Sequence, residues 1–153
     1  MTIYIILGII VVLVLFVIGI YNGLITAKTR VDETWKQIDV RLQNRYDLLP
    51  DLIQAVEKAV STDTNIQTRI AEVRSAASSA KAIESKPENA SQVAQAENAL
   101  TSALGGLRVS VEAYPELRSQ EAIQNFMNQD VVIEEKIAAS RQIYNSTARG
   151  YNE

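Results

Sequence analysis

The sequence contains no cysteine and no histidine. Without cysteine the chain forms no disulfide and carries no lipid attached to a lipoprotein cysteine. The missing side chains are also the ligands of most zinc sites, and histidine is the commonest general base. The usual nucleophile–base pairs that depend on these residues are excluded as well. We therefore expect a protein that is not an enzyme, with no catalytic, cofactor-binding or metal site.

The chain also lacks any long run of one charge. Its 15 basic and 18 acidic residues are spread along the sequence and leave a net charge of −3. A nucleic-acid-binding domain needs a basic face that follows the phosphates, and no such stripe is present. The pair Gly105-Gly106 lacks the lysine of a phosphate-binding loop. We expect neither a nucleic acid nor a small-molecule substrate as a partner.

One segment is free of polar side chains and is the longest apolar run. From Ile3 to Tyr21 there is no charged residue and no Asn, Gln, Ser or Thr. As a helix it would span about 28 Å, close to the hydrocarbon thickness of a bilayer, about 30 Å. A cleaved signal peptide would begin with basic residues and end at a small-residue site, and neither is present. Residues 1–22 are therefore predicted to be a retained membrane anchor in contact with lipid.

Basic residues follow this run and none precedes it. They are Lys28, Arg30, Lys36, Arg41 and Arg45. Lys and Arg near a membrane span mark the cytoplasmic side. The short N-terminus is predicted to lie outside and residues 23–153 to form a cytoplasmic domain.

After the span the apolar pattern becomes periodic. Two series of residues, each spaced by seven, form a seam: Leu24, Val31, Ile38, Arg45 and Leu52, with Lys28, Trp35, Leu42, Leu49 and Val56. This spacing is typical of a coiled coil and predicts one helix to about residue 60. Pro50 interrupts the helix interior, but the register continues beyond it, so we expect a kink and not an end.

Turn-forming residues divide the rest of the chain into three further helices, at about 64–84, 87–113 and 116–152. Four amphipathic helices with short connections predict an all-α, antiparallel bundle with coiled-coil-like packing behind the transmembrane helix. Its expected core comprises Trp35, Ile38, Leu42, Leu49, Leu52, Val56, Phe126, Ile137 and Tyr144.

Polar residues interrupt the apolar seams at Arg45, Asp130 and Arg141. Arg45 could be paired with an opposite charge inside the bundle, or could pack its stem and keep its guanidinium in water. Both interpretations remain open from the sequence. Within Gly105-Gly106, each glycine costs helix stability, so the pair suggests a close helix approach or a bend.

Two glycines four residues apart, Gly19 and Gly23, lie at the predicted cytoplasmic end of the span. Small residues at this spacing let membrane helices approach closely. With Leu24 and Val31 they form a candidate self-association surface, and we predict a homo-oligomer.

Four sequence stretches resemble one protein family. The longest is Trp-Lys-Gln-Ile-Asp-Val-Arg-Leu-Gln-Asn-Arg-Tyr-Asp-Leu-Leu-Pro-Asp-Leu at 35–52, followed in order by stretches at 113–117, 134–138 and 141–145. Together they resemble the LemA family of bacterial membrane proteins. The resemblance implies an inner-membrane protein with a helical bundle and no established enzymatic activity. Asp51, Gln120 and Ile123 depart from the family's usual residues.

These observations lead to a main hypothesis and two alternatives. The main one is a membrane-anchored scaffold or adaptor that associates through its helices with itself or with another membrane protein. The first alternative is a hydrolase or metal-dependent enzyme based on carboxylates, with Asp130, Glu134 and Glu135 as candidates. The second is a stalk-like subunit of a larger membrane complex, although three turn signals that fold the chain back disfavour it.

Overall fold

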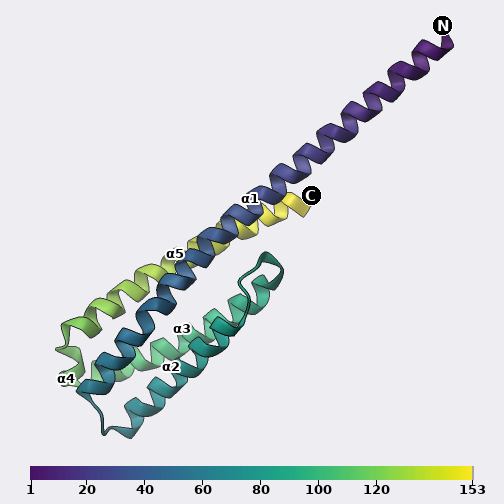
Figure 1. The fold of residues 1–153 in the computed structure, drawn as a ribbon. Coiled ribbons are helices and arrows are strands. Elements are labelled where there is room, and N and C mark those ends of the chain that lie inside the picture. Colours follow the sequence, from purple (N-terminus) through teal and green to yellow (C-terminus); the bar gives the residue numbers. More distant parts are fainter. Residues whose placement is uncertain (153) are drawn as a thin grey trace.

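The computed structural model of the protein describes residues 1–152, and these form helices joined by short turns, with no strand among them (Figure 1). The predicted all-α fold is confirmed. The elements in chain order are α1 Thr2–Ala59, α2 Thr64–Ala82, a 3-10 turn Pro87–Asn89, α3 Ala90–Ala113, α4 Pro115–Arg118 and α5 Glu121–Asn152.

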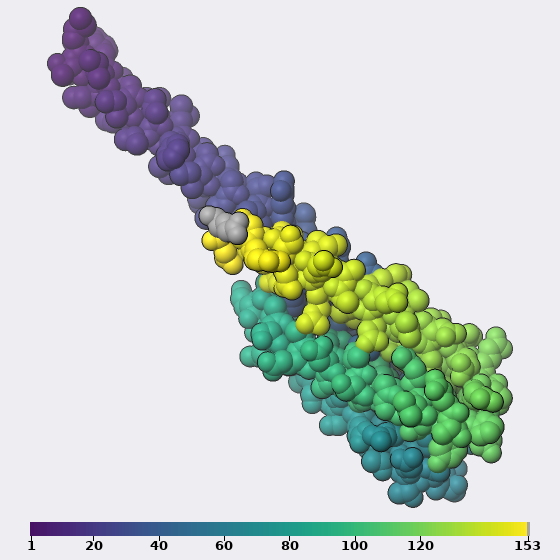
Figure 2. Space-filling view, turned by 180° about the vertical axis from the view of Figure 1, so that it is seen from behind, coloured from purple at the N-terminus to yellow at the C-terminus, as the bar shows by residue number. Residues whose placement is uncertain are grey.

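Helix α1 is continuous from the apolar N-terminal segment to the distal end of the bundle. It runs through Pro50 without ending, as the unbroken register predicts. Residues 1–26 are all exposed, and the part before Asn22 projects beyond the rest of the chain (Figures 1 and 2). The apolar part of this segment has a mean hydropathy of 3.4 over 18 residues and none of it is buried, so it is a candidate membrane span.

The bundle has an up-and-down antiparallel topology in which α1, α2, α3 and α5 alternate in direction (Figure 1). Helix α1 packs mainly against α5, and α2 packs mainly against α3. The C-terminal end of α5 returns along α1 toward the apolar segment (Figure 1). The folded-back chain is unlike a single long stalk helix.

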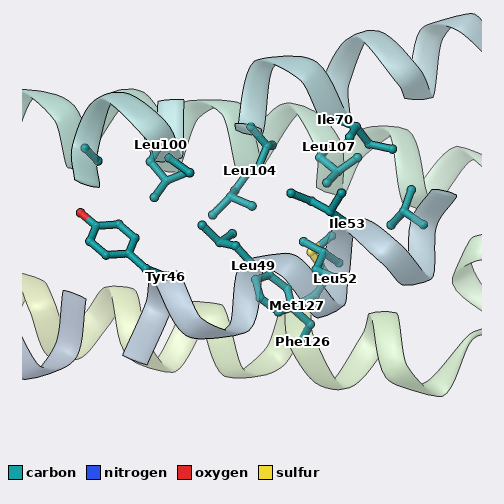
Figure 3. Close-up of a cluster of buried hydrophobic side chains, with 14 of the residues drawn as sticks. Tyr46, Leu49, Leu52, Ile53, Ile70, Leu100, Leu104, Leu107, Phe126 and Met127 are labelled. Carbon is teal, nitrogen blue, oxygen red and sulfur yellow. The ribbon is translucent and has the colours of Figure 1, made fainter. Parts of the chain in front are cut away.

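The core lies between the two helix pairs. Leu49, Leu52 and Ile53 of α1 sit between leucines of α3 and the Phe126–Met127 edge of α5 (Figure 3). Of the nine core residues expected from the sequence, eight are buried and Tyr144 is partly buried against the same cluster. The apolar stripe of α2 completes the core with the fully buried Ile66, Ile70 and Val73.

The seam of α1 is covered by the chain itself over most of its length. Leu24 is 50% exposed, but Val31 is only 9% exposed, and the seam stays buried from there to Val56. Helix α5 supplies the cover. Val31 therefore lies inside the bundle and does not belong to a free self-association surface, which is confined to the segment before it.

The last two helices begin differently from the prediction. The third starts with the 3-10 turn Pro87–Asn89, and the helix expected at 116–152 is interrupted between α4 and α5. Leu117 and Ile123 explain this break, because both are fully buried. Six residues apart on one helix, they would point about 120° apart. The interruption lets both side chains enter the core.

A polar contact joins the two turns at the distal end. Asp63 caps α2 by accepting hydrogen bonds from the Asn65 and Ile66 amides at 2.9 and 3.0 Å. Its other carboxylate oxygen accepts a bond from the Tyr114 hydroxyl at 2.5 Å. The bond from Tyr114 is the largest cause that lowers the pKa of Asp63, and the two amide bonds lower it further. The same bond to Asp63 raises the pKa of Tyr114. The contact holds the α1–α2 turn against the end of α3.

The two adjacent glycines of α3 have different surroundings. A Cβ added at Gly105 would meet no atom within 4 Å, so the predicted close helix approach is wrong at this position. A Cβ at Gly106 would lie 3.5 Å from Nη1 of Arg69 on α2, an ordinary contact. Helix α3 continues through both residues.

We predict that Gly105→Ala stabilises the protein by about 1 kcal/mol, because alanine restricts the unfolded chain and fits the helix without a clash. Thermal unfolding of the detergent-solubilised protein, followed by circular dichroism, measures the change. Gly106→Ala is the matched comparison and should gain less because its methyl group contacts Arg69. A lower melting temperature for Gly105→Ala would contradict the open environment described here.

Candidate functional site: a buried polar network

Arg45 is the centre of a polar network inside the bundle. It lies on the seam of α1 and is 1% exposed. Its Nε donates to Oδ1 of Asp130 on α5 at 2.9 Å, and its Nη2 donates to Oδ2 at 3.4 Å. Its Nη1 donates to Oε2 of Glu97 on α3 at 3.1 Å and to Oγ1 of Thr101 at 3.0 Å. One guanidinium thus links three helices.

Two further side chains complete the network. The hydroxyl of Tyr46 donates to Oε1 of Glu97. Arg108, which is 32% exposed, places its Nη2 3.6 Å from Oδ2 of Asp130. Two cations therefore face two carboxylates, and the network is neutral as a whole. Neutrality matters because an uncompensated charge in a protein interior costs several kcal/mol, by a rough estimate.

The titration behaviour of the network follows from this arrangement. Burial by itself lowers the pKa of Arg45, but the charges and hydrogen bonds of Asp130 and Glu97 more than compensate and raise it. Burial raises the pKa of Tyr46, and its hydrogen bond to Glu97 adds to the increase. Arg45 therefore stays charged and the Tyr46 hydroxyl stays a donor throughout the physiological pH range.

The structure decides between the two interpretations of Arg45. The guanidinium is buried and paired, and Asp130, the other polar seam residue, is its partner. Glu97 was not predicted, although its spacing provides a signal. It lies four residues after Val93 and three before Leu100, on the apolar face of α3, and is itself buried. A carboxylate at a core position of one helix is the expected counterpart of an arginine at a core position of another.

The carboxylates proposed for an enzymatic alternative have different environments. Both oxygens of Asp130 are engaged by arginines. Glu134 is partly buried and Glu135 is exposed, and neither joins the network. Within residues 1–152 no group of three or more acidic side chains is close enough to hold a metal ion.

The third seam residue, Arg141, lies outside the network. It is partly buried on α5, one turn before Tyr144. The Tyr144 ring packs edge-to-face on Trp35, with 5.0 Å between ring centroids and 66° between planes. At the other end of the chain, Gly19, Gly23 and Leu24 are exposed on the projecting part of α1.

We predict that Arg45→Met lowers the free energy of unfolding by about 3–5 kcal/mol, because it leaves two buried carboxylates without their partner. Arg41→Met is the matched control one turn earlier, where the partly exposed Nε donates to Oγ of Ser140 at 3.0 Å. That variant should lose about 1 kcal/mol. Chemical unfolding monitored by circular dichroism measures both.

A combined variant, Arg45→Met with Glu97→Met and Asp130→Leu, separates lost pairing from lost packing. It should recover much of the stability, because apolar side chains of similar volume replace the buried charges. Equal stability of Arg45→Met and Arg41→Met would contradict a buried, paired guanidinium.

Comparison with known proteins identifies the family of this chain. No curated protein matches the chain. The model of the LemA family matches residues 34–153, a range that contains all members of the polar network, α2 to α5 and the part of α1 from Thr34. The matched range begins in α1 just after Val31, the first buried residue of the seam, and beyond the apolar segment. The chain belongs to the LemA family.

Proposed function

We propose that the protein is a membrane-anchored, non-enzymatic scaffold that acts through helix–helix association, in the first place with copies of itself. The observation that supports this most is the free N-terminal part of α1. Residues 1–26 are exposed, whereas the rest of the chain forms a closed bundle with a neutral polar interior. The surface left for a helical partner is therefore on the anchor and where it enters the bundle.

Glycines on the anchor would provide the contact. Apolar side chains gain nothing by leaving lipid for one another, so membrane helices associate through close packing at small residues. Gly19 and Gly23 lie one turn apart, and within residues 1–152 no atom apart from their chain neighbours and the adjacent backbone of their own helix lies within 4 Å of a Cβ built on either. Their backbone is thus open to a second helix. Anchoring in one membrane aligns the copies and raises their effective concentration.

The continuous helix supports a scaffold role as well. No break separates the apolar segment from the seam of the bundle, so α1 is one rod of about 87 Å. Association of the anchors would therefore set the spacing and rotation of the attached bundles. A partner membrane protein that binds the same glycine face would be positioned in the same way.

The charge distribution supports a cytoplasmic bundle on a bacterial inner membrane. Lys28 and Arg30 follow the apolar segment closely, and Lys36, Arg41 and Arg45 come after them on the same helix. Positive residues are retained on the cytoplasmic side during insertion. The N-terminus would then face the periplasm.

The proposal predicts that the detergent-solubilised protein has the mass of an oligomer after correction for bound detergent. Gly19→Ile combined with Gly23→Ile should shift it toward the monomer, because the larger side chains keep the helices apart. Gly8→Ile is the matched control. It lies about 16 Å away along the axis, where crossed helices have diverged. A monomeric mass of the unchanged protein over a wide concentration range would refute self-association.

Orientation is tested with single cysteines, since the chain has none of its own. Ser78→Cys, on the exposed face of α2, should resist a membrane-impermeant thiol reagent in intact cells and react after lysis. Thr2→Cys, before the apolar segment, should react in intact cells once the outer membrane is permeabilised. The reverse pattern would place the bundle outside.

A further inference from the structure

A cavity of about 520 Å³ lies between α1 and α5 next to the apolar segment, where the C-terminal end of α5 lies along α1 (Figure 1). Most of its lining comes from α1, in the residues that follow Tyr21, the last residue of the apolar run. Small side chains leave the space between the two helices open. The lining includes Asn22, Gly23, Thr26 and Arg30 of α1 with Thr147 and Gly150 of α5.

The depth of this cavity matches the head-group layer of a membrane. Helix α1 rises about 1.5 Å per residue, so residues 22–26 lie within about 8 Å of Tyr21 along the helix axis. The polar layer on each side of a bilayer is about 5–7 Å thick. When the apolar segment crosses the hydrocarbon core, the cavity therefore opens among the lipid head groups.

Tyrosine side chains on both helices support this depth. Tyr21 on α1 is 63% exposed. Tyr151 on α5 is 36% exposed and directly follows Gly150 of the cavity lining. Tyrosine is enriched at membrane–water interfaces because its ring is apolar and its hydroxyl is polar. Each of the two helices thus presents an interfacial residue at the level of the cavity.

The polar groups of the cavity suit a negatively charged head group that carries hydroxyls. Among residues 1–152, Arg30 is the only charged residue that lines it. Side chains tilt toward the N-terminus of their helix, which directs Arg30 toward the apolar segment, the side on which lipid phosphates lie. The hydroxyls of Thr26 and Thr147 already donate to carbonyls of their own helices, so their oxygen lone pairs remain free to accept.

From this placement we propose that the cavity binds the head group of an anionic phospholipid whose head group carries hydroxyls. The phosphate lies beside the Arg30 guanidinium, whose planar donors suit phosphate oxygens, and the hydroxyls donate to Thr26 and Thr147. A choline head group fits less well, because Arg30 repels its ammonium and it has no donor. The acyl chains follow the apolar segment into the bilayer. The inference rests on the membrane anchor of the proposed function but not on self-association.

The test uses the full chain in nanodiscs made of equal amounts of phosphatidylglycerol and phosphatidylcholine. Native mass spectrometry after release from the nanodiscs counts the lipids that stay bound to each chain. The unchanged protein should retain phosphatidylglycerol over phosphatidylcholine by about fivefold or more, since one basic residue near the membrane surface contributes about 1 kcal/mol toward an anionic lipid. Equal retention of the two lipids would overturn the proposal.

Charge variants separate this site from general attraction to the membrane surface. Arg30→Gln should abolish the preference for phosphatidylglycerol. Lys28→Gln and Arg149→Gln are the matched controls, because both residues are exposed cations on the same two helices and neither lines the cavity. They should keep most of the preference. Equal loss in all three variants would overturn the proposal.

A steric variant tests the cavity without changing the charge. A Cβ at Gly150 meets no atom within 4 Å, so Gly150→Leu fits the helix and fills the space beside α1. It should reduce retention of phosphatidylglycerol as strongly as Arg30→Gln, and unchanged retention would overturn the proposal. Loss of the chain from the nanodiscs would refute the anchor and the site together. A chain that stays in the nanodiscs but shows no lipid preference would refute the site alone.

Discussion

The bundle depends on one buried ion cluster, the Arg45 guanidinium held by Asp130 and Glu97. The three members of the cluster lie on α1, α3 and α5, so the cluster connects the α1–α5 pair to the α2–α3 pair. A slip of α3 or α5 by one helical turn, about 5.4 Å, would separate its carboxylate from the Arg45 guanidinium, and a slip of α1 would separate both. Apolar seams tolerate such slips far better, because one leucine layer resembles the next. The cluster therefore selects one register among several that hydrophobic packing alone would allow.

The fixed register also determines how the candidate membrane span is connected to the bundle. Helix α1 carries the candidate membrane span at one end and the Arg45 cluster in its interior. Because the cluster fixes the alignment of α1 with α3 and α5, the apolar segment and the bundle are joined by one continuous helix in a single register. Pro50 lies beyond the cluster, so the segment between the membrane and the cluster contains no proline. That part of α1 connects the candidate membrane span to the cluster.

The packing between these helices changes along the axis of the bundle. On the membrane side of Glu97 the core is less complete, and a cavity takes the place of side chains. Every charge in the cluster has a partner, whereas the buried indole N–H of Trp35 makes no hydrogen bond with residues 1–152. A buried polar group without a hydrogen-bond partner is uncommon in folded proteins.

Short-range patterns in the sequence were enough to predict the local features of this protein. The apolar segment, the heptad seam from Leu24 to Val56 and the positions of the turns all follow from short-range periodicity and turn residues. These reflect the chemistry of neighbouring residues, which a single helix already displays. The break between α4 and α5 was missed because it depends on where Leu117 and Ile123 reach the core.

Contacts between residues far apart in the sequence depend on how the helices pack. Arg45, Glu97 and Asp130 are separated by tens of residues, and the pattern left open whether the arginine was buried or in water. It also could not say that α5 covers Val31 while Leu24 stays free, or that Gly105 faces open space. Each outcome depends on the axial alignment of packed helices. That alignment is a property of all the contacts together, and no single stretch of sequence encodes it.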